Sequence, residues 1–548
     1  MKRVWSGLLL VLLSVCAGAQ ERTVRVRLFW QHPPNELRIT PQGASLQTCH
    51  NCVPIRLTET RLVAAKGPRV VAGSTTGAAL ILRGRATISG EGFSAFMVEN
   101  ELKLQAREGF LLLTLRMPLE QYVAAVLQGE SAGFKSDEAL KAMAVAARTY
   151  AVHFGSRHRT EGFDFCDTTH CQDVRLGAQS ERIRAAVAAT AGELLWYQGQ
   201  SAATYYHRSC GGEIEDARAL ERHLQAPYLR HHRDEYCVRI PDEWDVQIIK
   251  SDLSRALGRP VTSVVIVERS ESGRVQELVV SGRPVAATDF RLEIGRTLGW
   301  DKLRSDLYEE QDLGDTVSFR GRDQGHGVGL CQTGAEMMGE QGRSYREILA
   351  YYYPGTSIGL NAQGLTWETL AGESLDLMTT NRADVVVLLP AAERALRLAT
   401  ERTGWSPSTR PQVKVYPSIG VYRDATGEPG WVAANTFGNV VRLQPISKLQ
   451  LAGSLDSTLR HEFLHMLIEA NAAPNAPLWL REGLAIYLAN PQAVRPASVD
   501  VNVMERQMHS LRTGEEMRAA YRACGAAVAD AVEKNSLDSV LSWVRTGR

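Results

Sequence analysis

The sequence predicts a multidomain α+β protein, and three observations lead to this fold class. With 548 residues the chain is too long for one compact core, so two or three domains are expected. Residues 22 to about 116 alternate apolar and polar side chains between Gly and Pro breaks, which is typical of β-strands. From Pro118 onward helical spacing is mixed with short alternating stretches, which favours helices combined with antiparallel strands.

The first twenty residues have the order of a secretory signal. Lys2 and Arg3 precede an apolar run over 4–16, which an Ala-Gly-Ala sequence follows. The run is short for a membrane span. We therefore predict a signal peptide over 1–19 and an exported protein that is periplasmic, cell-wall associated or secreted, with no later transmembrane segment. An uncleaved anchor is the alternative, and Cys16 leaves lipidation open although the preceding Val fits such a site poorly.

Composition narrows the classes of partner. The formal net charge is +1 and 22% of the residues are charged, so nothing indicates a nucleic-acid partner. Nine cysteines are present, and loss of Cys16 with the signal leaves eight, an even number that favours disulfides in an exported chain. The close pairs are Cys49 with Cys52 and Cys166 with Cys171, the preferred longer pairing is Cys210 with Cys237, and Cys331 and Cys524 have no obvious partner.

The elements that follow the β-rich start define the domain organisation. Pro118 suits the first turn of one helix, Ser136 caps a second, and a third runs near 180–191. Two short strands around Gln198-Gly199 indicate a hairpin over 194–206. We predict a β-rich region over 20–105, a mixed region over 106–360, a linker over 361–381 and a second mixed unit over 382–548. The last unit should contain a helix near 388–402, strands near 412–416 and 431–443, and then further helices.

One predicted helix face carries the first candidate catalytic residue. Apolar side chains at 119, 122, 123, 126 and 127 follow helical spacing, and Glu130 is the next position on that stripe. Burial of a carboxylate disfavours its charge, so its pKa rises and it stays protonated, as a general acid requires. The alternative, a helix that ends at Gly129 with Glu130 turned to solvent, stays open on periodicity alone.

Six motifs then follow one another over about 105–360. They are Tyr122-Val123 with Glu130, Glu138-Ala139-Leu140 with Ala147-Arg148-Thr149-Tyr150, Phe163-Asp164-Phe165-Cys166 with His170-Cys171-Gln172, Ser209-Cys210-Gly211-Gly212, Gly325-His326-Gly327-Val328-Gly329 with Cys331-Gln332, and Tyr351-Tyr352-Tyr353-Pro354-Gly355. In this order they resemble the stage II sporulation protein D (SpoIID/LytB) family, also called amidase enhancers.

The resemblance implies a lytic transglycosylase that acts on peptidoglycan, preferably on glycan strands stripped of their stem peptides. Glu130 stands where the family has its catalytic glutamate, which protonates the oxygen between MurNAc and GlcNAc. Its conjugate base then helps the MurNAc 6-hydroxyl close on C1 and form a 1,6-anhydro end. Because the substrate supplies the nucleophile, the second carboxylate that glycoside hydrolases need is not required.

His326 and Gln332 become candidate catalytic residues through the same resemblance. Glycines in the stretch 325–329 allow the backbone to approach a ligand closely, and His326 is placed to orient the sugar or the acid. A plain glycine-rich turn is the other interpretation of these residues. Asp323-Gln324 stands where a smaller lead-in is expected, which leaves the shape of the loop open.

A Cys/His segment is the first candidate for a metal. Cys166, His170 and Cys171 suit a structural zinc ion chemically, and the family resemblance points to the same role. A local disulfide between the two cysteines competes in an oxidising compartment, and the sequence leaves both alternatives open.

A His-Glu-x-x-His motif in the last region is the second candidate. His461 and His465 are four residues apart on one helix face, so both can bind one zinc ion, and Glu462 can act on the metal-bound water. Glu482, in Trp479-Leu480-Arg481-Glu482-Gly483, supplies a third ligand and leaves the fourth position open, as in catalytic zinc sites. The two motifs resemble those of gluzincin, or peptidase MA-like, metallopeptidases. A degenerate, inactive domain is the alternative.

These observations predict an exported peptidoglycan lytic transglycosylase coupled to a zinc metallopeptidase domain. Its partners would be glycan strands and, through the amidase-enhancer resemblance, a cell-wall amidase. Two other functions stay open. In one, the middle region only binds glycan and stimulates a separate amidase; in the other, it targets a zinc protease, the main activity, to the wall.

Overall fold

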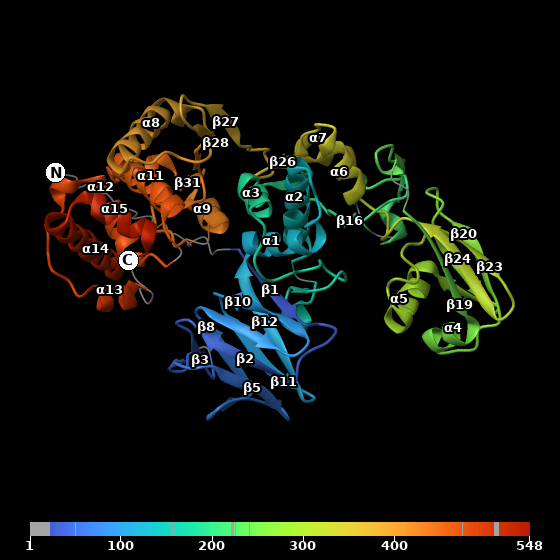
Figure 1. Cartoon of the computed structure of the whole chain (residues 1–548). Coiled ribbons are helices and arrows are strands. Elements are labelled where there is room, and N and C mark those ends of the chain that lie inside the picture. The colour runs from blue at the N-terminus through green and yellow to red at the C-terminus, as the bar shows by residue number, and fades with distance from the viewer. Residues whose placement is uncertain are drawn as a thin grey trace, which may run out of the picture. The chain divides into compact units, whose positions relative to one another are not determined.

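The computed structural model describes residues 22–547 except 50, 156, 221–223, 225, 240–241, 427, 474 and 509–513. The signal peptide predicted over 1–19 lies outside the described residues. The chain separates into two compact units, Thr23–Trp367 and Glu368–Arg548 (Figure 1), and each contains helices and sheets, so the multidomain α+β class is confirmed. Within the described residues, no helix combines the length and the apolarity that crossing a membrane requires.

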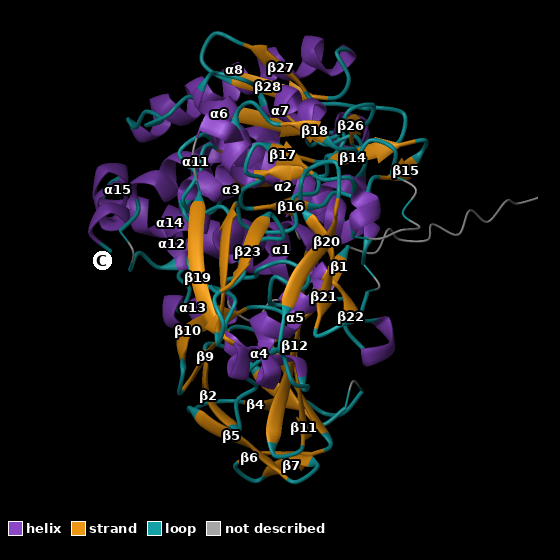
Figure 2. Cartoon of the chain, turned by 90° about the vertical axis from the view of Figure 1, so that its right-hand side faces the viewer, coloured by secondary structure: helices purple, strands orange, loops and turns teal. Residues whose placement is uncertain are grey.

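The first unit begins with two β-sheets. One has the strand order β13-β1-β12-β11-β8-β3-β4 and the other β10-β9-β2-β5-β6-β7, and several of their strands are labelled in Figure 2. Buried side chains alternate with partly exposed ones along the longest strand, β12, as one face packs on the other sheet. The strands are β1 (Thr23–Leu28), β2 (Glu36–Pro41), β3 (Ser45–Gln47), β4 (Ile55–Arg56), β5 (Arg61–Lys66), β6 (Arg69–Ala72), β7 (Thr75–Gly77), β8 (Ala79–Arg83), β9 (Ala86–Gly90), β10 (Phe93–Val98), β11 (Leu102–Arg107), β12 (Phe110–Pro118) and β13 (Phe165–Cys166).

The predicted boundary at 105/106 cuts through this sheet. It falls inside β11, which pairs with β12 along its whole length. One apolar core also extends from the two sheets into the helices that follow, because the buried side chains form a continuous cluster from Val24 to Tyr353. The β-rich region and the start of the mixed region therefore fold around a shared core.

The helices that follow carry the candidate site. The predicted cap at Ser136 is confirmed, because its Oγ accepts a hydrogen bond from the Ala139 N–H at 3.2 Å. The first helix begins one residue after Pro118, which ends β12 instead of opening the helix. The elements are α1 (Leu119–Glu130), α2 (Asp137–His153), α3 (Glu181–Ala189), β14 (Leu194–Tyr197), β15 (Gln200–Ser201), β16 (Tyr206–His207), β17 (Glu213–Ile214), β18 (His232–Arg233), β25 (Leu330–Cys331), α6 (Gln332–Glu340), α7 (Tyr345–Tyr352) and β26 (Ser357–Gly359).

The hairpin predicted around Gln198-Gly199 forms, but its second strand lies earlier in the chain than predicted. β14 pairs with β15, which covers Gln200 and Ser201 and ends before the predicted second strand at 202–206.

Between β18 and β25 the chain contains an inserted α/β segment that the sequence did not reveal. It has two three-stranded sheets and its own apolar core, built around Leu253, Phe290 and Phe319. Its elements are β19 (Glu243–Ile249), α4 (Lys250–Leu257), β20 (Val264–Arg269), β21 (Val275–Val280), β22 (Arg283–Ala286), α5 (Ala287–Leu298), β23 (Tyr308–Asp312) and β24 (Thr316–Arg322). We call residues 243–322 the insertion.

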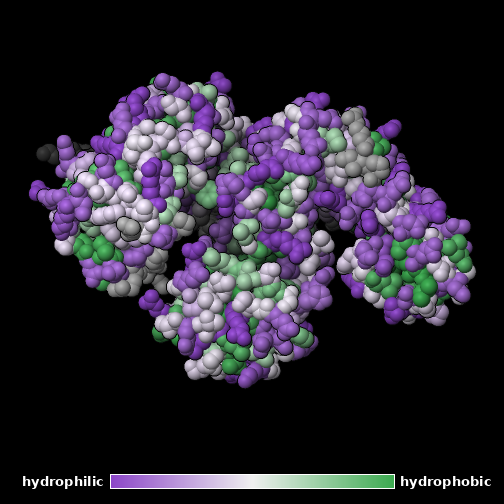
Figure 3. Space-filling model, viewed as in Figure 1, coloured by the Kyte–Doolittle hydropathy of each residue, from purple (hydrophilic) through white to green (hydrophobic). Residues whose placement is uncertain are grey.

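The insertion exposes apolar side chains on its surface (Figure 3). Its large, substantially exposed apolar residues are Ile249, Val265, Val267, Trp300 and Leu313.

The second unit is a five-stranded sheet with helices. Its strand order is β27-β28-β29-β31-β30, in which the three middle strands are parallel and both edge strands are antiparallel to their neighbours. The elements are β27 (Glu368–Ala371), β28 (Asp376–Thr379), α8 (Ala383–Thr403), β29 (Gln412–Val415), α9 (Ile419–Thr426), β30 (Ala434–Phe437), β31 (Val440–Leu443), α10 (Ile446–Leu451), α11 (Leu455–Asn471), α12 (Leu478–Ala489), α13 (Val501–Met508), α14 (Gly514–Lys534) and α15 (Leu537–Thr546).

Part of the predicted linker belongs to this unit. Residues 368–371 and 376–379 form β27 and β28, and Leu377 is fully buried in the core of the unit. These strands escaped the sequence pattern because each is only four residues long, which is too short to show a clear alternation of apolar and polar side chains.

Candidate active site

Glu130 is the last residue of α1. The helix does not end at Gly129, because the Ser131 N–H still donates to the Leu127 carbonyl at 2.8 Å. The stripe that precedes it on α1 is buried as predicted. Glu130 itself is only partly exposed, and its carboxyl accepts hydrogen bonds from within the protein.

Two donors from distant segments hold this carboxyl. The Asp173 N–H donates to Oε1 at 2.9 Å, and the Gln332 side-chain amide donates to Oε2 at 3.2 Å. Burial raises the pKa of Glu130, and these two hydrogen bonds oppose that effect without cancelling it. The negative charge of Asp173 raises the pKa further, while Arg208 lowers it. The structure thus brings together Glu130 and Gln332, two of the predicted catalytic residues.

The end of α1 is packed against the segment that carries Asp173. A Cβ on Gly129 would lie 2.2 Å from the Asp173 carbonyl oxygen, so only glycine permits this approach. The preceding Gln172 is buried and accepts a hydrogen bond from the Tyr122 hydroxyl at 2.9 Å. Its amide donates to the Tyr206 hydroxyl at 2.8 Å. This polar chain connects α1 to β16.

His326 lies in the glycine-rich loop and contacts backbone groups on either side of it. Its Nδ1 accepts a hydrogen bond from the Val328 N–H at 3.0 Å, and the ring also contacts the backbone of Tyr206. Burial lowers its pKa well below the usual range, and His207 nearby adds to the effect, so the ring is neutral at pH 7. Among the described contacts, none joins His326 to Glu130, and the ring holds the loop against β16.

The glycines of this loop lie close to other protein atoms. Gly325, Gly327 and Gly329 all have positive φ. A Cβ on Gly327 would lie 2.3 Å from the Arg274 guanidinium carbon, and one on Gly329 would lie 2.1 Å from the Tyr205 carbonyl oxygen. The loop therefore needs glycine because the chain packs on itself there.

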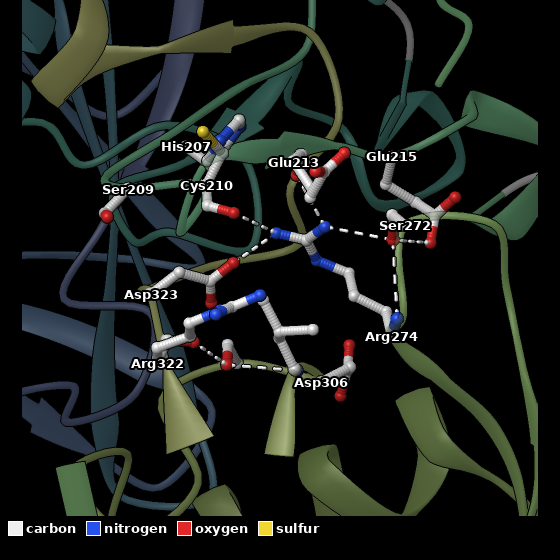
Figure 4. Close-up of polar contacts among 12 residues, drawn as sticks. His207, Ser209, Cys210, Glu213, Glu215, Ser272, Arg274, Asp306, Arg322 and Asp323 are labelled. Atoms are coloured by element: carbon white, nitrogen blue, oxygen red, sulfur yellow. Dashed lines mark hydrogen bonds and ion pairs between the residues drawn. The ribbon is translucent and has the colours of Figure 1, made fainter. Parts of the chain in front are cut away.

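Arg274 of the insertion anchors this loop region (Figure 4). Its guanidinium forms a buried ion pair with Asp323 and donates to the backbone carbonyls of Glu213 at 2.7 Å and Cys210 at 2.9 Å. Asp323 stands just before the glycine-rich loop, where the sequence indicates a smaller residue. It adopts a positive φ of +74°. The pair connects the insertion to the segment that precedes His326.

The predicted Cys/His site gains a fourth member in the structure. Cys166, His170 and Cys171 are joined by His158, and the four possible ligand atoms all lie within 4.8 Å of one another. His158 Nε2 lies 3.4 Å from the Cys171 sulfur, and its Nδ1 lies 2.6 Å from a Glu161 oxygen, the orienting contact that metal-bound histidines usually have. The two thiols are free, so the competing disulfide does not form, and the donor set fits zinc.

Sequence reasoning missed His158. It stands eight residues before Cys166 and only the turns between them bring the two side chains together. No fixed spacing of this kind marks a zinc motif, although a histidine close to a Cys-x₄-Cys pair is a weak signal.

The structure also differs from the predicted disulfide between Cys210 and Cys237. Both are free, buried thiols, and Cys331 lies with them. The one bond present in the described residues joins Cys49 and Cys52, the first of the close pairs.

In the second unit the three predicted zinc ligands meet between α11 and α12. Ligand atoms of His461, His465 and Glu482 lie within 4.8 Å of one another, and His465 Nε2 is 3.0 Å from a Glu482 oxygen. Burial lowers the pKa of His461 to about 3. Burial also opposes the charge on His465, but the acidic neighbours outweigh it and raise the pKa to about 9. The donor set of two imidazoles and a carboxylate fits zinc.

Glu462 lies beside these ligands. Its side chain is buried, and Oε2 accepts a hydrogen bond from the Thr436 hydroxyl of β30 at 2.8 Å. Burial raises the pKa of Glu462. The helix that carries Glu462 begins at Leu455, and Ser454 occupies its cap position without a side-chain hydrogen bond.

Comparisons with known proteins identify relatives of this chain and a family model that matches part of the first unit. A family model described as "SpoIID: Stage II sporulation protein" matches residues 108–197. Stage II sporulation protein D of Bacillus amyloliquefaciens is 30% identical over 264 residues, which cover 44% of this chain and 74% of that protein. The protein of the same name in Bacillus subtilis (strain 168) is 29% identical over 269 residues, with 44% and 74% covered. An amidase enhancer of Bacillus subtilis (strain 168) is 25% identical over 289 residues, with 42% and 39% covered.

Proposed function

Because this chain belongs to the stage II sporulation protein D family, we propose that its 106–360 region is a peptidoglycan lytic transglycosylase with Glu130 as general acid and base. The relatives named stage II sporulation protein D and amidase enhancer support a cell-wall related function. One observation carries the enzymatic proposal. It is the Glu130 carboxyl, whose pKa burial raises and which Asp173 and Gln332 hold in one orientation.

The proposed reaction uses Glu130 twice. The protonated carboxyl gives its hydrogen to the oxygen between MurNAc and GlcNAc as the bond to MurNAc C1 breaks. The carboxylate then accepts the proton of the MurNAc 6-hydroxyl while O6 bonds to C1, which forms the 1,6-anhydro ring and restores the acid. The two hydrogen bonds from Asp173 and Gln332 stabilise the carboxylate between these steps, and His326 positions the loop that precedes Gln332.

Digestion of purified sacculi tests this proposal. Intact sacculi and sacculi stripped of stem peptides are incubated with the full chain, and the released muropeptides are analysed by mass spectrometry. We expect 1,6-anhydro-MurNAc ends, with more product from the stripped strands. Reducing MurNAc ends would indicate a hydrolase instead. If no glycan is cut but an added cell-wall amidase becomes faster, the region is a binding module that enhances the amidase.

The pH profile should respond in opposite directions to two substitutions near Glu130. The general acid must be protonated, so kcat/KM falls as pH rises through its pKa. Gln332→Met removes a hydrogen bond that lowers this pKa, so the alkaline limb should move to higher pH while the rate falls. Asp173→Asn removes a charge that raises it but keeps the backbone donor, so the limb should move to lower pH. The rate of anhydro-product release is measured for each variant from about pH 4 to 9. This range covers the usual carboxyl pKa values and values above them. Shifts in the same direction would contradict the role of Glu130.

A second activity is favoured by the meeting of His461, His465 and Glu482. We propose a gluzincin-like zinc metallopeptidase in the 382–548 region, which these three residues equip with metal ligands. Bound zinc would supply Lewis-acid activation of water. Glu462 would take the proton of that water, and the Thr436 hydroxyl holds its carboxyl in place. Both activities in one chain would suit remodelling of peptide-linked glycan.

Glu462→Gln should separate metal binding from catalysis. The ligands are untouched, so the zinc content should not change, but loss of the general base should slow peptide cleavage by about 10²-fold. Cleavage of unfolded proteins and of stem peptides, with and without a chelator, is measured by mass spectrometry. Glu533→Gln, on the exposed side of α14, is the matched control. Equal cleavage by wild type and Glu462→Gln, or cleavage that survives the chelator, would rule out this site.

A further inference from the structure

Three cysteines and an aspartate from separate parts of the first unit meet in its interior. Cys210 follows β16, Asp234 and Cys237 follow β18, and Cys331 ends β25. All four residues are fully buried. Their three sulfurs and one carboxylate oxygen all lie within 4.8 Å of one another, and the Cys210 sulfur is 3.3 Å from Asp234 Oδ2. We call these residues the thiol cluster.

We propose that the thiol cluster binds one structural zinc ion through three thiolates and the Asp234 carboxylate. Structural zinc sites are closed, four-coordinate and tetrahedral, and cysteine sulfur is their most common ligand. With Zn–S bonds of about 2.3 Å, the ligands of a tetrahedral site are about 3.8 Å apart. The observed spacing therefore needs only small side-chain movements to close on the ion, and the three thiol protons leave to solvent as the bonds form.

The composition of the cluster favours a metal over a disulfide. Three thiols can form only one disulfide, which would leave the third thiol buried beside a carboxylate. In the described part of the chain, Asp234 has hydrogen bonds from the N–H groups of Tyr236 at 3.0 Å and Cys237 at 3.1 Å and from the Tyr352 hydroxyl at 2.9 Å, but no cationic partner. A buried carboxylate without a cation is costly, and a zinc ion would supply the missing charge.

The groups around the thiol cluster stabilise negative charge on its sulfur and carboxylate atoms. Cys331 caps α6, and its sulfur accepts a hydrogen bond from the Gly334 N–H at 3.4 Å, so the positive end of the helix faces the sulfur. A Cβ on Gly334 would lie 2.6 Å from Asp234 Oδ2 and 2.1 Å from the Tyr352 hydroxyl oxygen. Only glycine lets α6 approach the carboxylate this closely. Tyr352 then serves as the hydrogen-bonded support that a ligating carboxylate normally has.

The site would also fix the geometry around Glu130. Cys331 is followed directly by Gln332, whose amide donates to Glu130, so an ion at Cys331 would hold the start of α6 and with it this donor. This consequence rests on the proposed transglycosylase function. The zinc site itself does not, and its test therefore uses metal content and thiol state.

Zinc content measured by mass spectrometry of the purified full chain tests the site. The parent is Cys166→Ser/Cys171→Ser, which removes the other sulfur-containing group. Adding Cys237→Ser or Cys331→Ser should lower the zinc content by one equivalent per chain. In the parent, Co²⁺ exchanged for zinc should show the near-ultraviolet absorption of thiolate bound to cobalt, and this absorption should weaken in both variants. The control Cys49→Ser/Cys52→Ser, in the same parent, should change neither quantity.

A second measurement on the wild-type chain keeps the test decisive if a variant fails to fold. The chain is unfolded in a chelator without reductant, alkylated, digested and analysed peptide by peptide. For a zinc site, Cys210, Cys237 and Cys331 should all be alkylated without any reductant, because none of the three is in a disulfide. If two of them resist alkylation until a reductant is added, or if zinc content is the same in parent and variants, the zinc proposal is overturned. These outcomes do not depend on glycan cleavage, so they are separable from failure of the Glu130 proposal.

Discussion

Glu130→Gln should reduce the release of 1,6-anhydro ends by about 10²- to 10⁴-fold, the usual contribution of a positioned acid or base. The amide has nearly the same shape, so hydrogen bonds near it can largely be kept, but it has no acidic hydrogen to give to the glycosidic oxygen. The side chain also cannot take the proton of the attacking 6-hydroxyl. Both halves of the reaction should fail together, because the proposed reaction uses Glu130 as its one carboxylate and requires no second one.

The measurement compares wild type and variant on stripped sacculi by mass spectrometry, together with a sacculus pull-down. Glu340→Gln, an exposed position at the end of α6, is the control and should keep the full rate. Glu130→Gln should still bind the strands, because the substitution removes the acid and leaves the rest of the surface. Retained cleavage would remove Glu130 from the mechanism and would leave the glycan-binding alternative as the better account.

Arg274→Met should destabilise the first unit by about 3–5 kcal/mol, the usual effect of removing one partner of a buried ion pair. Arg274 is 1% exposed and Asp323 is fully buried, so neither charge can turn to water. The substitution leaves the Asp323 carboxylate without its cation and the Glu213 and Cys210 carbonyls without a donor (Figure 4). Urea unfolding of the full chain, with hydrogen exchange of peptides from the insertion, measures the loss. We expect peptides of 270–280 and 320–328 to exchange faster.

The penalty of Arg274→Met should also depend on pH. Burial raises the pKa of Asp323 to about 7, and Arg274 opposes that effect, so removal of the arginine raises the pKa further. A folded-state pKa above the unfolded value makes the folded state bind more protons, and stability then falls as pH rises. Relative to wild type, the extra loss should appear above pH 7, where wild-type Asp323 ionises beside Arg274.

Arg320→Met is the matched control for this pair. Arg320 and Asp245 belong to the same insertion, but their side chains are 76% and 53% exposed. Exposed pairs contribute about 0–1 kcal/mol, so the control should change stability little. A loss of the same size in both variants would contradict the view that burial makes the Arg274–Asp323 pair critical.

Local patterns were sufficient for some parts of the fold. The cap at Ser136 and the apolar stripe of α1 depend on neighbours three or four residues away, so the sequence alone predicts them. The pair His461 and His465 likewise follows from one helical turn. Short strands are different, because four residues carry little periodicity, and the sequence predicts a linker where β27 and β28 form.

The amino-acid sequence is enough to show which chemical groups are present and which of them share a helix face: the acid at Glu130, the paired histidines, and the cysteine-rich segments. Which distant groups meet depends on the packing of the whole unit. Gln332 reaches Glu130 across 202 positions of sequence, His158 joins Cys171, and Cys331 joins Cys210 and Cys237. The physical reason is that spacing along a helix or strand follows from backbone geometry, whereas contacts between distant segments depend on how whole elements pack around the shared core.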